Sequence, residues 1–101
     1  MLIYNITLKI EWTIQSPWLQ WMQQVYITAI MDTGCFTRYQ LVRLVEIEEE
    51  EGPTYALQLY AANREHYNNY IENHLLHFEA KSYEKWGGDV LLFSTVMEIV
   101  E

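Results

Sequence analysis

The first ten residues of the chain alternate between apolar and more polar side chains. Extended over residues 2–10, the segment carries Ile3, Asn5, Thr7 and Lys9 on one side, and on the other it carries an apolar row of Leu2, Tyr4, Ile6, Leu8 and Ile10. Successive side chains of a strand point to opposite faces, so this period predicts a strand with one buried face. Such a strand needs a sheet whose apolar face is covered by other elements.

Five further elements follow from local patterns. Trp18, Met22, Val25 and Ala29 recur at helical spacing, which predicts a helix over residues 17–32 with Ser16 as its N-cap and Gly34 at its end. β-branched and aromatic residues predict strands over 36–47, 55–60 and 90–100. Apolar residues at helical spacing predict a second helix over 64–85, capped by Asn63 and stopped at Gly87.

The order of these elements is β-α-β-β-α-β over residues 1–101, with no repeat and no linker. The chain is therefore expected to be one domain with a ferredoxin-like α+β fold. In that fold a four-stranded antiparallel sheet carries both helices on one face, and right-handed crossovers place the first and third strands in the middle.

The last predicted strand is apolar on both sides. Its two faces carry Leu91, Phe93, Met97 and Ile99 on one side, and Val90, Leu92, Val96 and Val100 on the other. Two helices cover only one sheet face, and an uncovered apolar patch is unusual on a monomer. We therefore expect a homodimer of the dimeric α+β barrel type, in which uncovered faces pack together and Asn5, Thr7 and Gln58 are the polar members of the interface.

Composition narrows the partners and the compartment. The chain holds 6 Lys and Arg against 14 Asp and Glu, a net charge of −8. This acidic balance argues against nucleic acid and anionic lipid as partners, and no apolar run is long enough for a membrane helix. A single Cys35 and the lack of a signal-peptide pattern indicate a reducing, cytoplasmic location.

Five of the acidic residues form one run at the tip of the hairpin between the second and third strands, namely Glu46, Glu48, Glu49, Glu50 and Glu51. Such a run keeps a sheet edge solvated and discourages edge pairing. An alternative is an acidic adaptor that docks a basic partner through this run. We expect Arg38 and Arg43 on the second strand to pair with these acidic residues rather than to bind a carboxylate ligand.

Aromatic residues supply the candidates for a ligand pocket. Trp18, Trp21, Tyr55 and His74 are placed to line the space between the helices and the sheet, where bulky rings and a few polar groups suit a small apolar or aromatic ligand. The alternative is that these rings simply form the core. A continuous cavity at these four residues would support binding of a small ligand. A solid core there would exclude it and leave assembly or binding of a protein partner as the remaining functions.

Metal and cofactor chemistry have little support in the sequence. His66, His74 and His77 lie on one side of the second helix, but no cysteine completes a ligand set. The chain has no Gly-rich phosphate loop, no paired cysteines, no His-Glu-x-x-His and no Gly-x-Ser-x-Gly. We therefore expect neither a metal nor a cofactor.

Four short motifs resemble one family. They are Trp18-Leu19-Gln20-Trp21-Met22, Thr33-Gly34-Cys35-Phe36-Thr37, Thr54-Tyr55-Ala56-Leu57-Gln58 and Phe93-Ser94-Thr95. In their order and spacing they resemble the bacterial "domain of unknown function" family 4286. The resemblance spans nearly the whole chain and implies a fold related to the dimeric α+β barrels, with no assigned activity.

Two departures from the family pattern limit what the resemblance carries. Tyr26-Ile27-Thr28 stands where the family commonly has His-Ile-Pro, and Ser82 stands where a histidine occurs. No catalytic residue is therefore transferred. The sequence favours a non-enzymatic homodimer that binds a small apolar or aromatic molecule or a protein partner. The alternative, by analogy of fold alone, is a cofactor-independent oxygenase or isomerase.

Overall fold

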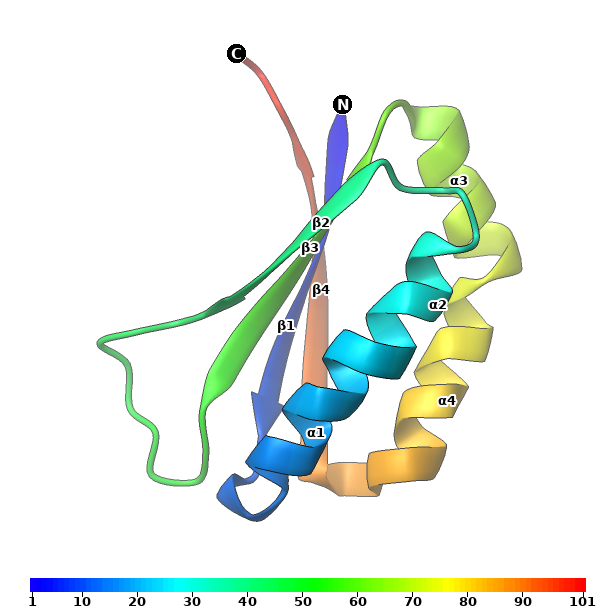
Figure 1. Ribbon diagram of the computed structural model, residues 1–101. Coiled ribbons are helices and arrows are strands. Elements are labelled where there is room, and N and C mark those ends of the chain that lie inside the picture. Colours follow the sequence, from blue (N-terminus) through cyan, green and yellow to red (C-terminus); the bar gives the residue numbers. More distant parts are fainter.

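The computed structural model describes all 101 residues and is built on one four-stranded antiparallel sheet (Figure 1). The strand order is β2-β3-β1-β4, so the first and third strands are central as predicted. The strands span β1 Leu2–Ile10, β2 Arg38–Arg43, β3 Thr54–Ala61 and β4 Val90–Glu98. This arrangement confirms the ferredoxin-like α+β fold.

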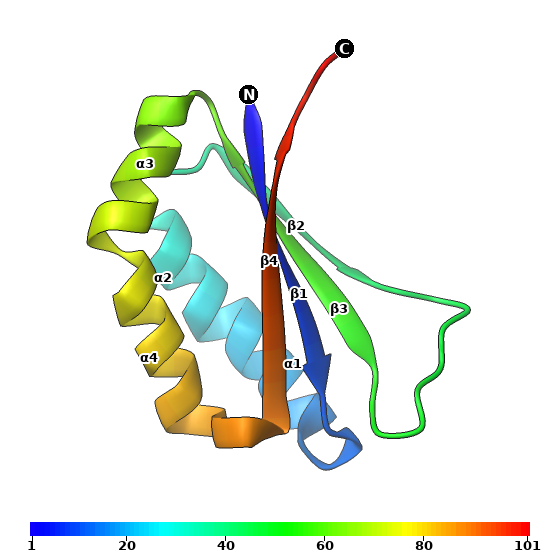
Figure 2. The ribbon, with the colours of Figure 1, turned by 180° about the vertical axis from the view of Figure 1, so that it is seen from behind.

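All helices lie on one face of this sheet (Figures 1 and 2). The first crossover runs continuously through α1 (Gln15–Trp21), the π-helical segment η2 (Met22–Tyr26) and α2 (Ile27–Met31). The second consists of α3 (Arg64–Asn73) and α4 (Leu75–Trp86). The opposite face carries no helix and is called the open face below. None of these helices has both the length and the apolar composition of a membrane-spanning segment.

The first helix begins earlier than predicted. A 3₁₀ turn, η1 (Trp12–Ile14), leads directly into α1, and the residue at the N-cap is Ile14. The backbone carbonyl of Trp12 already accepts from the amide of Gln15, so the expected side-chain cap at Ser16 is wrong. The other end is as predicted, because Gly34 takes a φ of 77° after α2.

The second helix is broken where a single helix was predicted. Asn63 caps α3 as expected, and its Oδ1 accepts from the amide of His66 at 2.9 Å. At His74 the backbone leaves the helical region, with φ −127° and ψ −29°, and α4 starts at the next residue. Gly87, with φ 59°, ends α4.

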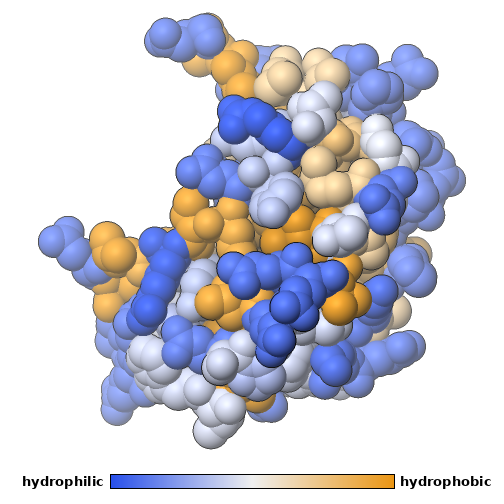
Figure 3. Space-filling model, viewed as in Figure 1, coloured by the Kyte–Doolittle hydropathy of each residue, from blue (hydrophilic) through white to orange (hydrophobic).

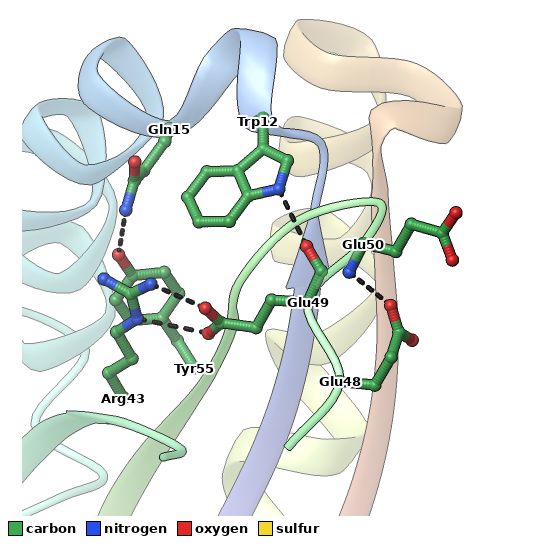
Figure 4. Close-up of polar contacts among 7 residues, drawn as sticks. All are labelled: Trp12, Gln15, Arg43, Glu48, Glu49, Glu50 and Tyr55. Carbon is green, nitrogen blue, oxygen red and sulfur yellow. Dashed lines mark hydrogen bonds and ion pairs between the residues drawn. The ribbon is translucent and has the colours of Figure 1, made fainter. Parts of the chain in front are cut away.

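Residues 44–53 form a long hairpin that projects from the sheet, so β2 is shorter than predicted (Figure 1). Three contacts tie its acidic part to the body, and Figure 4 shows the two that Glu49 makes. Trp12 Nε1 donates to the Glu49 carbonyl at 2.8 Å, Arg43 pairs with the Glu49 carboxylate at 3.0 Å, and Lys9 lies 3.9 Å from the Glu51 carboxylate. Part of the acidic run is thus neutralised by its own chain, as expected for Arg43.

The predicted inner row of β1 is buried throughout, and direct cross-strand pairs show which residues share its face. Tyr4 pairs with Leu59, Ile6 with Leu57 and Leu8 with Tyr55, so these residues face the helices. With Trp18, Met22 and Ile30 they form one continuous core.

The hairpin returns to the sheet through a close backbone approach at Gly52. A β-carbon at this position would overlap the carbonyl oxygen of Ile10. We therefore expect Gly52→Ala to lower the free energy of unfolding by about 3 kcal/mol or more, because backbone would have to move. Urea denaturation measures this. Gly88→Ala, where a β-carbon meets nothing, is the control and should change stability by less than about 1 kcal/mol. Equal stability of the two variants would contradict the described hairpin.

Candidate functional site

A small, partly open cavity lies between the sheet and the helical layer, where η2, α3 and α4 meet the sheet. It has a volume of about 20 Å³, enough for about one water molecule. Its wall is apolar apart from three phenol hydroxyls and one carboxylate. The lining residues are Tyr4, Ile6, Leu8, Met22, Tyr26, Leu57, Tyr70, Leu75, Phe78, Glu79 and Leu92.

The cavity lies beside the edge strand β4. Leu75, Glu79 and Leu92 are half-buried and lie where α4 faces this strand. Ser94 and Val96 continue the same face of β4, since they pair with Ile6 and Tyr4, yet both are exposed. The helices therefore leave the far part of β4 uncovered beyond Leu92.

The three tyrosines that line the cavity come from different elements. Tyr4 lies on β1, Tyr26 on η2 and Tyr70 on α3. Burial raises the pKa of all three phenols above the ordinary value of 10.0, and repulsion from the Glu79 carboxylate adds to it. At neutral pH these hydroxyls are therefore protonated, and they act as hydrogen-bonding groups rather than as bases.

One of these three hydroxyls, that of Tyr26, already donates a hydrogen bond within the protein. Tyr26 donates to the backbone carbonyl of Phe78 at 2.8 Å, which ties η2 to α4 across the core. Its ring is edge-on to Phe78 at a centroid distance of 5.7 Å. The oxygen of Tyr26 keeps its lone pairs free for an incoming donor.

Glu79 is the only charged residue in the wall. It forms no ion pair, because the two ion pairs of the protein are Lys9 with Glu51 and Arg43 with Glu49. No side-chain hydrogen bond reaches its carboxylate. The cavity thus combines apolar walls, neutral phenols and one carboxylate without a partner.

The structure places the four sequence-predicted pocket residues elsewhere. Trp18 is fully buried against Tyr55, with ring centroids 5.1 Å apart, and Trp21 packs on Tyr26 at 4.7 Å. His74 stacks on Tyr70 at 6.0 Å. The expectation of one pocket shared by these residues is corrected, because the ring of Trp18 packs against the sheet and the ring of Trp21 packs between Tyr26 and Trp86.

Tyr55 alone of the four borders a hollow, and it is a different one. This is an open groove of about 410 Å³ beside the edge strand β2, lined by Leu19, Gln23, Ile27, Tyr39, Leu41, Val42, Arg43 and Tyr55. Gln15 Nε2 donates to the Tyr55 hydroxyl at 3.0 Å (Figure 4). His66 and His77 lie on the exposed side of the second helical segment, and no three ligating side chains of the protein converge on a metal site.

Sequence reasoning did not place Tyr70 or Glu79 at a pocket, and it counted Tyr4 and Tyr26 only among the aromatic side chains that could line a pocket or form the core. Tyr4 and Tyr70 did show a usable signal, because both fall on predicted buried faces although each carries a hydroxyl that needs a partner. Glu79 gave none, since an acidic residue in a predicted helix is normally solvated.

The comparison with known families gives a direct match. A model of the family described as "Domain of unknown function (DUF4286)" matches residues 1–100. The chain belongs to this family. The resemblance noted in the sequence is therefore confirmed, and the family itself carries no assigned activity. No curated protein matches the sequence significantly.

Solved structures share the fold across kingdoms. HapK from Hahella chejuensis superposes with a TM-score of 0.73 at 11% identity, over 99% of this chain and 93% of its own. An ethyl tert-butyl ether d (ethd) family protein from Bacillus halodurans gives 0.73 at 12% identity, over 99% and 100%. At3g17210 from Arabidopsis thaliana gives 0.61 at 16% identity, over 98% of each chain. At such identities the likeness shows the fold alone.

The buried tyrosines make the protein sensitive to alkali. Unfolding exposes phenols that ionise near 10.0, whereas the folded pKa values are higher, so the unfolded state loses protons first. The free energy of unfolding should therefore be highest below pH 10 and should decrease as the pH rises above 10. We expect Tyr70→Phe to reduce this fall by about 1.4 kcal/mol per pH unit in urea titrations between pH 10 and 12. Tyr83→Phe, at an exposed position, should match the wild-type slope. Equal slopes for both variants would contradict the burial of Tyr70.

Proposed function

We propose that the protein is a cytoplasmic homodimer in which each protomer binds one small apolar or aromatic molecule. The cavity beside β4 carries this proposal. Ligand sites combine apolar walls with a few placed polar groups, and this wall does so with three hydroxyls and one carboxylate. The proposed ligand site is therefore the space between β4 and α4, and not the surroundings of the tryptophans of α1.

The size of the cavity requires that it widens when a ligand enters. Protein cores are close-packed, so a ring must displace side chains or a helix. Two features support such a movement here. Leu75 and Leu92 at the wall are only half-buried, and α4 starts directly after the break in helical backbone geometry at His74.

The open face supports the homodimer. Across its four strands the only charged residues are Lys9 and Arg38, so none of the 14 acidic residues lies there. In a chain with a net charge of −8, this is the surface on which two copies meet with least repulsion. Apolar side chains mark the same face, because Phe93 is 67% and Leu91 54% exposed on β4.

A polar row crosses the middle of the open face. Cross-strand pairing aligns Gln40, Gln58, Asn5 and Thr95 in register from β2 to β4. Asn5 Nδ2 also donates to Thr7 Oγ1 at 3.3 Å. Amide and hydroxyl groups both donate and accept, so such a row suits its own copy across a two-fold axis. The predicted interface residues Asn5, Thr7 and Gln58 all lie on this face.

The state of Cys35 agrees with the proposed compartment. The residue is free and buried, and Asn69 Nδ2 lies 3.4 Å from its sulfur. A buried thiol held by a hydrogen bond is inert to disulfide exchange and suits a reducing environment.

The dimer is tested by sedimentation equilibrium at micromolar concentration. We expect a species of twice 12.1 kDa, and we expect Phe93→Glu to shift it to the monomer by placing a carboxylate on the open face. Tyr83→Glu is the matched control, since Tyr83 is 70% exposed on α4, and this variant should remain dimeric. A wild-type protein that sediments only at 12.1 kDa overturns this part of the proposal.

Ligand binding is tested by native mass spectrometry of protein from its own host, together with NMR titration with benzyl alcohol. We expect amide shifts at residues of the cavity. Leu75→Trp should abolish them by filling the cavity, whereas Leu76→Trp, at a neighbouring position that is 78% exposed, should leave them unchanged. The ligand proposal fails if neither a retained molecule nor a cavity-centred response is found.

A further inference from the structure

Glu79 is the feature that the proposed binding of an apolar molecule does not explain. Glu79 is a half-buried residue at the wall of an otherwise uncharged cavity, and no Lys, Arg or His lines that wall. A carboxylate beside apolar side chains is stabilised by a cation or a hydrogen-bond donor that pairs with it. No residue of the protomer supplies that partner.

We infer that the cavity binds a small organic ammonium ion with an apolar body, whose charge pairs with the carboxylate of Glu79. This inference rests on the ligand-binding function proposed above and adds the chemical class of the ligand. The cation supplies the partner that the protein lacks, and the apolar body occupies the space along Leu75, Leu92 and Phe78.

All six cationic side chains of the protein lie outside the cavity wall. Lys9 and Arg43 are paired with the hairpin carboxylates, and Arg38 lies over the ring of Tyr60 at 3.7 Å on the open face. Lys85 lies over Trp86 at 5.4 Å, and the remaining two, Arg64 and Lys81, belong to α3 and α4. With a net charge of −8, the field at the cavity therefore favours a cationic ligand and opposes a carboxylate.

The aromatic wall supports the same class of ligand. The rings of Tyr4, Tyr26, Tyr70 and Phe78 line the cavity, and Tyr70 and Phe78 lie nearly parallel at 6.0 Å. Aromatic rings attract a desolvated ammonium group through their quadrupoles. The Tyr26 hydroxyl already donates to the Phe78 carbonyl, so its oxygen offers a lone pair to the ammonium hydrogens.

The ligand class is tested with three molecules that share one ring and differ in charge: benzylammonium, benzyl alcohol and benzoate. We expect NMR titration of the full chain in 0.15 M salt to give an affinity for benzylammonium about tenfold above that for benzyl alcohol, with no binding of benzoate. Each ligand should shift amides of α4 and β4 at the cavity. The inference is overturned if benzoate or benzyl alcohol binds as tightly as benzylammonium, although the proposed function would then survive. If no molecule binds, the proposed function fails as well.

Variants at one helix separate the pairing from a general effect of negative charge. Glu79→Gln should reduce the affinity for benzylammonium to that of benzyl alcohol and leave the alcohol unchanged. Glu84→Gln removes one exposed charge of the same helix outside the cavity, and it should preserve the tenfold preference. A preference that survives in Glu79→Gln, or that is lost equally in both variants, contradicts the assignment to Glu79. The wild-type series decides the ligand class even if a variant fails to fold.

Discussion

The structure depends on the burial of one face of β1. Every second side chain of this central strand, five in all, packs against the helical layer. This row therefore sets both the register of β1 with β3 and the side of the sheet that the helices occupy. A shift of one residue would turn this row outward, because side chains alternate with a period of two. The open face is the direct consequence, since the same chain has no third layer to cover it (Figure 2).

The acidic residues are distributed unevenly over the two faces of the sheet and the elements around it. The acidic residues lie on the helices, on the projecting hairpin and at the chain end, while the open face has none. In the space-filling view, hydrophilic side chains cover much of the visible surface and apolar atoms are exposed on the projecting hairpin (Figure 3). The acidic side chains and the open face therefore occupy different parts of the surface.

The cavity arises where the helical layer stops short of the sheet edge. Residues of α3 and α4 cover β1 and the start of β4, but Ser94 and Val96 remain exposed on the same face. Three tyrosines and Glu79 surround the resulting space. The polar groups there come from four different elements, β1, η2, α3 and α4, which is why no short motif indicated them.

The sequence by itself determined the order of elements, the buried face of β1, the Asn63 cap and the stops at Gly34 and Gly87, because local period and backbone freedom decide these features. Asn5, Thr7 and Gln58 lie on the open face, and their place in a dimer interface stays a prediction. Only the tertiary structure decided the break at His74 and the position of the cavity. In the sequence, a pattern of aromatic residues is equally compatible with a packed core and with a ligand pocket. Only the packing of the rings showed that Trp18 and Trp21 fill the core. Tyr4, Tyr26 and Tyr70 instead line the cavity.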